Sequence, residues 1–272
     1  MSPERPDPRP PSSPALPSWL LEVEPVRLLL VSDFDGTLSE IVPNPDQARA
    51  LPGVDRTLAA LASHLLAVCI LSSRDSTQLR GLLPVPGIEL LGDYGMGSLS
   101  GREAAALQRF NEEAARLLTA WPGVSLEAKT GSTAVHYRRA PDAAGDLARA
   151  LPPLAVRLGL ACGFGRSVLE VRPKAADKGV ALARLIGRLA PEGVVFVGDD
   201  ENDRPAFKLL AHRERSYSVG VRSDESPPGL FEGCDLVVDG PREAAEFLSR
   251  LAGWAGSRRP PPGPSAGRRS NA

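Results

Sequence analysis

Cysteine is scarce in this sequence, and its three copies, Cys69, Cys162 and Cys234, lie far apart without Cys-x-x-Cys spacing. An odd number of widely separated cysteines argues against a disulfide framework and against a structural zinc site. Cys69 stands inside the apolar segment VCIL, and we interpret it as a core residue.

An excess of positive charge is also absent, because the formal net charge is −1. Nucleic-acid-binding domains usually carry a basic patch, so we expect no nucleic-acid partner. No apolar run approaches the roughly 18 residues that cross a membrane. The N-terminal segment MSPERPDPRPPSSPALPS lacks the apolar stretch of a signal peptide. We therefore expect no membrane partner and a cytoplasmic location, and we take the protein to be a monomer.

Both ends of the chain are rich in proline. Proline removes backbone donors and fixes φ, so residues 1–17 and 257–272 are predicted to be disordered. The run PPPGP near the C-terminus could instead bind as a polyproline-II ligand, and its neighbouring arginines could contact an anionic surface. An inert tail is the simpler interpretation.

The stretch LLLVSDFDGTL, residues 28–38, places two aspartates directly after an apolar run. Such a run is typical of a strand buried on both faces of a parallel sheet, and open α/β sheets bind ligands at the carboxyl edge of their strands. Asp33 and Asp35 are two residues apart, so a continuing strand would place both carboxylates on one face. The segment therefore predicts an acidic site at the sheet edge.

This pair of carboxylates suits phosphoryl transfer. One can attack phosphorus to form an aspartyl-phosphate, and the other can protonate the leaving oxygen and then activate water. Carboxylates approach a phosphate only beside a hard cation, for which we expect Mg²⁺, and beside a lysine. Two simpler interpretations are a helix-capping turn and a Ca²⁺ loop, although the glycine comes too early for an EF-hand.

A second apolar segment, LLAVCIL, is followed by Ser72, Ser73 and Arg74. Two hydroxyls and a guanidinium at the end of a strand suit the oxygens of a phosphate group, so we predict that these three residues bind phosphate. The alternative is a helix N-cap, in which Ser73 or Asp75 opens the helix DSTQLRGLL. The sequence leaves both interpretations open.

Residues 101–173 follow a different pattern from the rest of the chain. Residues 102–121 predict an amphipathic helix, and residues 124–128 and 133–138 predict a hairpin. A second helix within residues 141–158 and a second hairpin at 160–172 complete an αββαββ unit. A crossover between parallel strands needs only about a dozen residues, so this unit is interpreted as an insertion that serves as a lid. We predict an α/β fold, with a Rossmann-like parallel-sheet core at residues 25–100 and 174–254 and an inserted α+β cap domain at residues 101–173.

Further candidate residues follow the insertion. Lys178 stands at the start of a predicted helix and would face the same anion, unless it is an ordinary surface lysine. The apolar segment VVFV ends at Gly198, and Asp199 comes directly after it. Asp199 could complete the ligands of the cation, whereas Asp203 could orient the loop or contact a metal-bound water.

The order of these motifs resembles that of the haloacid dehalogenase-like phosphohydrolases. The motifs are DxDGT, a hydroxyl after the second strand, a lysine before a helix, and GDDxxxD. Within that superfamily, the chain resembles the trehalose-6-phosphate phosphatases across residues 28–251. The segments that carry this resemblance are DFDGTLSEIVPNPDQA, ILSSR, STAVHYR, VLEVRPKAADKG and GDDENDRPAF. The resemblance implies a phosphatase for this sugar phosphate. It implies that Asp33 is the nucleophile, Asp35 the acid and base, and Ser72 and Lys178 the phosphate ligands. It also implies Mg²⁺ held by Asp33 and Asp199, with Asp203 in support and Asp35 contributing its backbone carbonyl.

The cap contains three candidate sugar-binding residues, Glu127, Lys129 and Glu170. Glu127 and Lys129 are two apart on one predicted strand and share a face, and Glu170 lies within the second hairpin, so the three are expected to converge. The family resemblance agrees, through the segments LExK and LEVRPK. The alternative is that they are solvated charges on an exposed sheet face. The family commonly has histidine where this chain has Tyr94, so Tyr94 is expected near the sugar.

Three other functions stay open at this point. The chain could hydrolyse another sugar or sugar-acid phosphate, because related lids serve several substrates. It could be a phosphomutase, or a non-catalytic regulator that binds a sugar phosphate. The last alternative is disfavoured because every expected catalytic position is filled.

Overall fold

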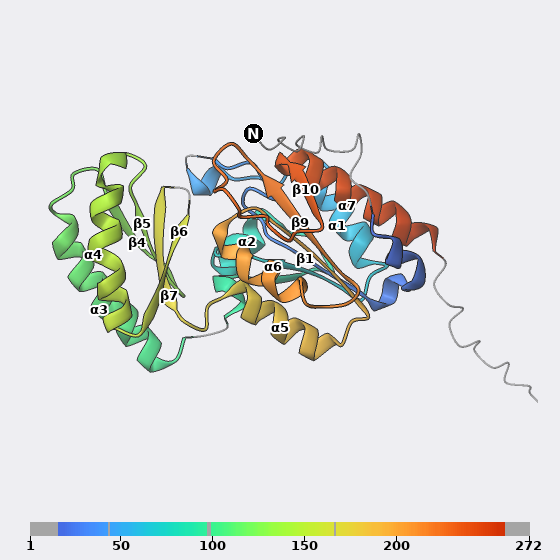
Figure 1. Ribbon diagram of the computed structural model, residues 1–272, viewed down its shortest axis with the longest axis horizontal. Helices are drawn as coiled ribbons and strands as arrows, with labels where there is room; N and C mark the ends of the chain where they lie inside the picture. Colours follow the sequence, from blue (N-terminus) through green and yellow to red (C-terminus); the bar gives the residue numbers. More distant parts are fainter. Residues whose placement is uncertain (1–15, 43, 97–98, 166, 259–272) are drawn as a thin grey trace, which may run out of the picture.

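Two sheets lie side by side in the computed structural model, which describes residues 16–42, 44–96, 99–165 and 167–258 (Figure 1). The prediction of disorder for residues 1–15 and 259–272 lies outside the described residues. Leu16, at the end of the proline-rich lead-in, packs against the core.

The larger sheet is entirely parallel and has the strand order β10-β9-β8-β1-β2-β3. Its strands are β1 (Leu28–Ser32), β2 (Ala67–Leu71), β3 (Glu89–Leu91), β8 (Gly193–Gly198), β9 (Ser216–Arg222) and β10 (Leu236–Asp239). The surrounding helices are α1 (Val54–Ala62), α2 (Ser76–Leu82), α5 (Lys178–Leu189), α6 (Arg204–Leu210) and α7 (Gly240–Ser257).

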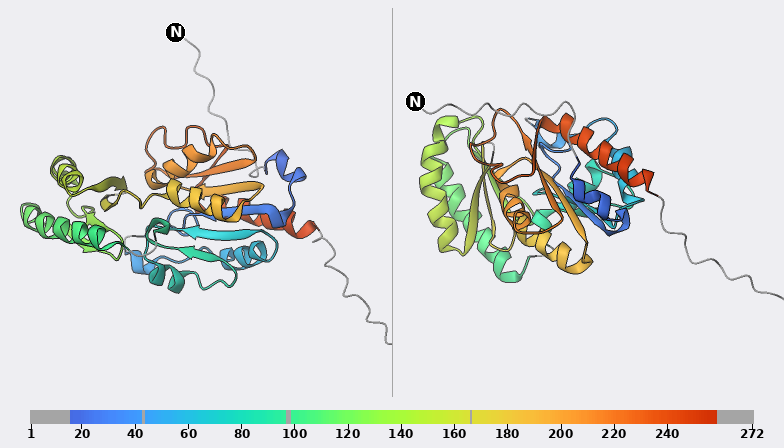
Figure 2. Two further views of the ribbon diagram at one scale, coloured as in Figure 1. Left: turned by 90° about the horizontal axis from the view of Figure 1, so that it is seen from below. Right: turned by 45° about the vertical axis from the view of Figure 1, so that its right-hand side comes forward.

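Alternating side chains of β1 reach opposite faces of this sheet. Leu28 and Leu30 belong to the hydrophobic cluster that contains α1 and α7. Leu29 and Val31 belong to the cluster that contains α5 and α6. The two helical layers can be followed in Figure 2. Because helices cover both faces, the sequence of β1 is continuously apolar rather than alternating.

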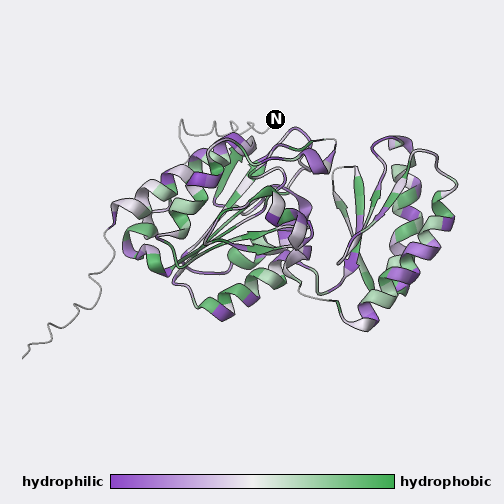
Figure 3. Ribbon diagram, turned by 180° about the vertical axis from the view of Figure 1, so that it is seen from behind, coloured by the Kyte–Doolittle hydropathy of each residue, from purple (hydrophilic) through white to green (hydrophobic). Residues whose placement is uncertain are grey.

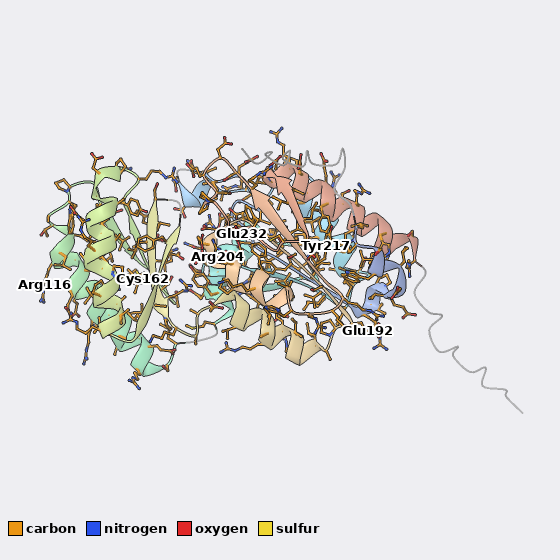
Figure 4. All side chains as sticks on the ribbon, in the orientation of Figure 1. Arg116, Cys162, Glu192, Arg204, Tyr217 and Glu232 are labelled. Carbon is orange, nitrogen blue, oxygen red and sulfur yellow. The ribbon has the colours of Figure 1, made fainter. Side chains whose placement is uncertain are left out.

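The smaller sheet is antiparallel and has the order β4-β5-β7-β6. Its strands are β4 (Ser125–Ala128), β5 (Thr133–His136), β6 (Leu160–Gly165) and β7 (Val168–Pro173), and its helices are α3 (Gly101–Leu118) and α4 (Ala144–Arg157). The helices bury one face of the sheet through residues such as Phe110 and Leu147. Arg116 marks the helical side, which is turned away from the core in Figure 4. The other face of the sheet is therefore directed toward the core.

The observed order of elements confirms the predicted α/β core with an inserted αββαββ unit, which we call the cap. Figure 3 shows hydrophobic residues concentrated on the strands of both sheets. Of the helices within the described residues, none combines the length and the apolar character that crossing a bilayer requires.

Candidate active site

The candidate catalytic residues meet at the carboxyl edge of the parallel sheet. Asp33 directly follows β1, Ser72 follows β2, and Asp199 follows β8. These three strands are neighbours in parallel register, so their carboxyl ends lie together. A cavity of about 850 Å³ opens between this edge and the cap. Its lining includes Asp33, Asp35, Ser73, Arg74, Lys178 and Asp199 from the core, and Glu127, Lys129, His136 and Glu170 from the cap.

Lys178 is buried between two aspartates. Its ammonium nitrogen lies 3.0 Å from Asp33 Oδ1 and 2.6 Å from Asp203 Oδ1, and the residue is only 2% exposed. Burial opposes the charged form of Lys178, but Asp203 and Asp33 outweigh it and raise the lysine pKa. Burial raises the pKa of Asp33, against the opposing effect of Lys178. Lys178 is thus an internal cation at the site rather than a surface lysine.

Asp203 uses both carboxylate oxygens within the protein. Oδ1 accepts the Lys178 hydrogen bond, and Oδ2 accepts hydrogen bonds from the backbone N–H groups of Asp199 (2.9 Å) and Asp200 (3.0 Å). These bonds hold the turn after β8 in place. Of the two roles that the sequence suggests for Asp203, the hydrogen bonds favour orientation of the loop.

The arrangement of Asp33 and Asp199 suits a hard cation. Carboxylate oxygens of Asp33, Asp199 and Asp203 lie within 4.8 Å of one another, and all three residues are buried. Thr37 donates a hydrogen bond to Asp199 Oδ1 (3.1 Å). Gly36 has φ +75°, and a Cβ atom there would lie 2.0 Å from Asp199 Oδ2, so only glycine lets the two loops approach. A cluster of buried carboxylate oxygens is the ligand set that suits Mg²⁺.

Asp35 forms a two-point ion pair with Arg74. The Nε and Nη2 atoms of Arg74 each donate a hydrogen bond of 2.7 Å to one carboxylate oxygen of Asp35. The guanidinium therefore orients Asp35 at the cavity wall. The binding of phosphate by Arg74 stays a prediction.

The residues of the turn after β2 have different contacts. Asp75 is the N-cap of α2, because its side chain accepts hydrogen bonds from the N–H groups of Thr77 and Gln78. Ser72 is buried, and its hydroxyl oxygen accepts a hydrogen bond from the Arg74 N–H (3.1 Å). Ser73 lines the cavity. Of the two capping candidates, Asp75 is therefore the one that caps α2, and Ser73 remains at the cavity wall.

The three predicted cap residues converge on the face that looks toward the core. Glu127 and Glu170 flank Ala134 in one row across β4, β5 and β7. Lys129 follows the end of β4, and its Nζ lies 3.4 Å from Glu170 Oε1. Burial raises the pKa of Glu170 to about 7, and its Oε2 has no hydrogen-bond partner among the described residues. A buried acceptor at a cavity wall is suited to a ligand hydroxyl.

Sequence reasoning missed His136 and misplaced Tyr94. His136 lines the cavity and its Nε2 lies 2.8 Å from Glu127 Oε2. Strand alternation could have identified it, since it lies two residues from Ala134 on the face that carries Glu127. Tyr94 was expected near the sugar, but it is 1% exposed and packs with Met96 and Ala176. The described residues that line the cavity do not include it.

Comparisons with known proteins identify relatives of this chain. The family model described as trehalose-phosphatase matches residues 31–228. A trehalose-phosphate phosphatase from Mycobacterium bovis is 34% identical over 242 residues, an alignment that covers 81% of this chain and 60% of the relative. The chain thus spans about 60% of the length of that curated relative.

Solved structures share the fold. The C-terminal domain of the Candida albicans trehalose-6-phosphate phosphatase has a TM-score of 0.69 and 23% identity, with 89% of this chain and 98% of that chain covered. A sucrose-phosphatase from Synechocystis, solved with sucrose and phosphate, has a TM-score of 0.54 and 18% identity, with 84% and 98% covered.

Proposed function

Because the chain belongs to the trehalose-phosphatase family, we propose that it is a Mg²⁺-dependent phosphatase that hydrolyses trehalose 6-phosphate to trehalose and phosphate. The observation that carries the proposal is one cavity with two different walls. The core wall presents Asp33, Lys178 and Asp199, which suit a phosphate and a cation. The cap wall presents Glu127, Lys129 and Glu170, which suit sugar hydroxyls.

In the proposed reaction, a carboxylate oxygen of Asp33 attacks phosphorus while the bond between phosphorus and the sugar oxygen breaks. Asp35 gives a proton to the departing sugar oxygen, and trehalose leaves. Asp35 then takes a proton from water, which attacks the aspartyl-phosphate and regenerates Asp33 with release of phosphate. Bound Mg²⁺, held by Asp33 and Asp199, would neutralise phosphate charge as the carboxylate approaches.

Other core residues hold the phosphate during both steps. Lys178 supplies a positive charge that cannot move away, because Asp203 and the start of α5 fix its position. Ser72 and Ser73 supply hydroxyls at the end of β2, and Arg74 keeps the Asp35 carboxylate oriented. Asp203 holds the turn that carries Asp199.

Recognition of the sugar falls to the cap. Carboxylates accept hydrogen bonds from hydroxyl groups, and an ammonium donates hydrogen bonds to them. Glu127, Glu170 and Lys129 together can therefore bind the hydroxyl groups of a sugar ring. Each such charge-assisted bond contributes about 1.5–3 kcal/mol, which corresponds to roughly tenfold or more in specificity. A small ester that lacks the second sugar would gain little from these residues.

The test is phosphate release from a panel of sugar phosphates, measured with Mg²⁺ and with EDTA. The panel contains trehalose 6-phosphate, sucrose 6-phosphate, glucose 6-phosphate and p-nitrophenyl phosphate. We expect trehalose 6-phosphate to give the highest kcat/KM, EDTA to abolish release, and Asp33→Asn to be inactive but folded. Preference for another member of the panel would replace the substrate, and full activity of Asp33→Asn would refute the mechanism.

The cap residues are tested on the same panel. Glu127→Ala and Glu170→Ala should each reduce kcat/KM for trehalose 6-phosphate by roughly tenfold or more, while p-nitrophenyl phosphate is hydrolysed almost as before. Equal losses on both substrates would remove these two residues from the sugar site.

A further inference from the structure

Two short linkers join the core and the cap, and the first has an unusual backbone. This linker runs between β3 and α3, and within it Asp93 and Tyr94 have φ values of 50° and 58°. Two consecutive non-glycine residues in the left-handed region persist only where their surroundings hold them. The N–H of Asp93 donates to the carbonyl of Arg74 (2.8 Å), and that of Tyr94 donates to the carbonyl of Ser72 (2.9 Å). Asp93 and Tyr94 are therefore fixed to the turn after β2 that carries Ser72 and Arg74.

Arg172, near the end of β7, contacts this linker and also the second one. The central carbon of its guanidinium lies 4.7 Å from the centroid of the Tyr94 ring, a cation–π contact. Its Nε donates a hydrogen bond to the carbonyl of Ala176, which lies between β7 and α5. A single side chain from the cap is thereby anchored on both connections to the core.

The environment of Arg172 is unusual for a charged residue. It is 9% exposed, and its Nη1 has no hydrogen-bond partner among the described residues. Buried arginines are normally paired with an acid. A nearby acid is Glu170, whose pKa burial raises and the Arg172 charge lowers. The direct contacts of the guanidinium are instead the Tyr94 ring and the Ala176 carbonyl.

Glu170 is the cap residue that this anchoring affects most directly. It lies two residues before Arg172 on β7, so both side chains are on the core-facing side of the cap sheet. Glu170 lines the cavity, and its buried Oε2 is unpaired among the described residues. A small rotation of β7 about the linkers would move this carboxylate relative to Asp33 and Lys178.

We propose that Arg172 is a positioning residue, which clasps the Tyr94 ring and the Ala176 carbonyl and so fixes the angle of the cap that places Glu170 over the core site. The inference rests on the proposed function in one respect, since Glu170 is taken to bind the sugar. Arg172 itself does not line the cavity. Its charge also lowers the pKa of Glu170, and Arg172→Lys, which keeps that charge, separates this effect from the positioning of β7.

The test compares Arg172→Lys, Arg172→Met, Tyr94→Leu and the matched control Tyr94→Phe, each in the full chain. Hydrogen exchange by mass spectrometry follows peptides that contain residues 92–96 and 174–177. Steady-state kinetics follow trehalose 6-phosphate and p-nitrophenyl phosphate. Lysine keeps the charge but loses the planar guanidinium, and phenylalanine keeps the ring but loses the hydroxyl.

We expect the two Arg172 variants and Tyr94→Leu to increase exchange in both linkers and to raise KM for trehalose 6-phosphate, each roughly five- to tenfold. Turnover of p-nitrophenyl phosphate should stay within about twofold, and Tyr94→Phe should match the wild type in every measurement. Unchanged exchange in Arg172→Met and Tyr94→Leu overturns the proposal, and so does a Tyr94→Phe variant as disturbed as Tyr94→Leu. If Arg172→Met fails to fold, the two Tyr94 variants decide. If the variants exchange faster but the wild type hydrolyses no trehalose 6-phosphate, the contact of Arg172 with both linkers is supported and only the proposed function is refuted.

Discussion

Lys178 neutralises only part of the negative charge of the buried aspartates at the core site. One ammonium lies between the carboxylates of Asp33 and Asp203, so the described cluster holds more negative than positive charge. Buried ion pairs contribute little net stability, but removal of one partner leaves an uncompensated charge. The cluster therefore depends on its cations, which is consistent with a site that takes up Mg²⁺.

Lys178→Met should lower the free energy of unfolding by about 3–5 kcal/mol at pH 8 in EDTA, because two buried carboxylates lose their counterion. Lys178 opposes the effect of burial on the pKa of Asp33, so without the ammonium the Asp33 carboxyl group binds its proton still more tightly in the folded state. The loss should therefore shrink as the pH falls toward 5. Urea titrations at pH 8 and pH 5 measure it, with the exposed Lys208→Met as control. A loss that is equal at both pH values would contradict this account of the cluster.

Glu170 and Glu127 lie in one row of the cap but should respond oppositely to pH. Burial raises the pKa of Glu170 from 4.5 to about 7, so the folded state binds its proton more tightly, and its contribution to stability falls as pH rises through that window. The hydrogen bond from His136 lowers the pKa of Glu127, so its contribution is present above the unfolded value and is lost as pH falls. Glu170→Gln should flatten the decline in unfolding free energy between pH 5 and 7, whereas Glu127→Gln should not. Identical pH profiles for both variants would refute the assignment.

Several site residues could be predicted from the sequence because each follows an apolar segment directly. Asp33 and Asp199 terminate buried strands, and parallel pairing then brings them to one edge. The partner of Arg74 could not be predicted in this way. A guanidinium at a strand end can reach a phosphate or the neighbouring Asp35, and only the side-chain conformation decides between them.

At the scale of elements, the αββαββ order of the cap was predictable, since helical periodicity and strand alternation switch at recognisable turns. The short helices at Ser18–Glu22 and Pro25–Arg27 were not predicted. They contain few residues and no periodic pattern, and their position depends on packing of Leu20 and Val23 against the core. The approach of β6 to the core likewise follows from tertiary contact and not from local sequence.

Gly165 lies in β6 where the cap comes close to Asp200 of the core, so a substitution at this position tests that contact. A Cβ atom at this position would lie 3.0 Å from Val168 Cγ1 and 3.2 Å from Asp200 Oδ2. Gly165→Ala should displace the cap edge by a few tenths of an ångström and raise KM for the sugar phosphate by roughly a few-fold. Gly187→Ala, in the last turn of α5 with no atom within 4 Å of its Cβ position, should instead stabilise the protein by about 0.4–1 kcal/mol without a change in KM. An unchanged KM in Gly165→Ala would mean that this contact does not limit sugar binding.

At the scale of the whole molecule, the core and the cap have separate hydrophobic clusters. We therefore propose residues 101–173 as the cap and residues 25–100 with 174–254 as the core, to which Leu20 also belongs because it lies in the core cluster. The chain enters and leaves the cap through two linkers that lie close together, since Arg172 contacts both. In the role proposed for Arg172, these two contacts hold the angle between the cap and the core.

Truncation distinguishes the part of the N-terminal segment that stabilises the core from the part that does not. Leu20 and Val23 are almost completely buried, Trp19 packs against the core, and Arg258 donates a hydrogen bond to the carbonyl of Leu21 (2.8 Å). A chain of residues 16–258 retains all of these contacts, so its Tm should lie within about 2 °C of the full chain.

A chain of residues 24–258 loses two fully buried side chains, each of which contributes about 1.5–3 kcal/mol. Its Tm should therefore fall by on the order of 10 °C, as measured by thermal unfolding at one protein concentration. If removal of residues 1–15 alone lowered the Tm by this much, those residues would have to be packed against the core. If the chain of residues 24–258 were as stable as the full chain, the burial of Leu20 and Val23 would contribute nothing to folding. The difference in Tm between the two truncated chains therefore measures the stabilisation that residues 16–23 provide.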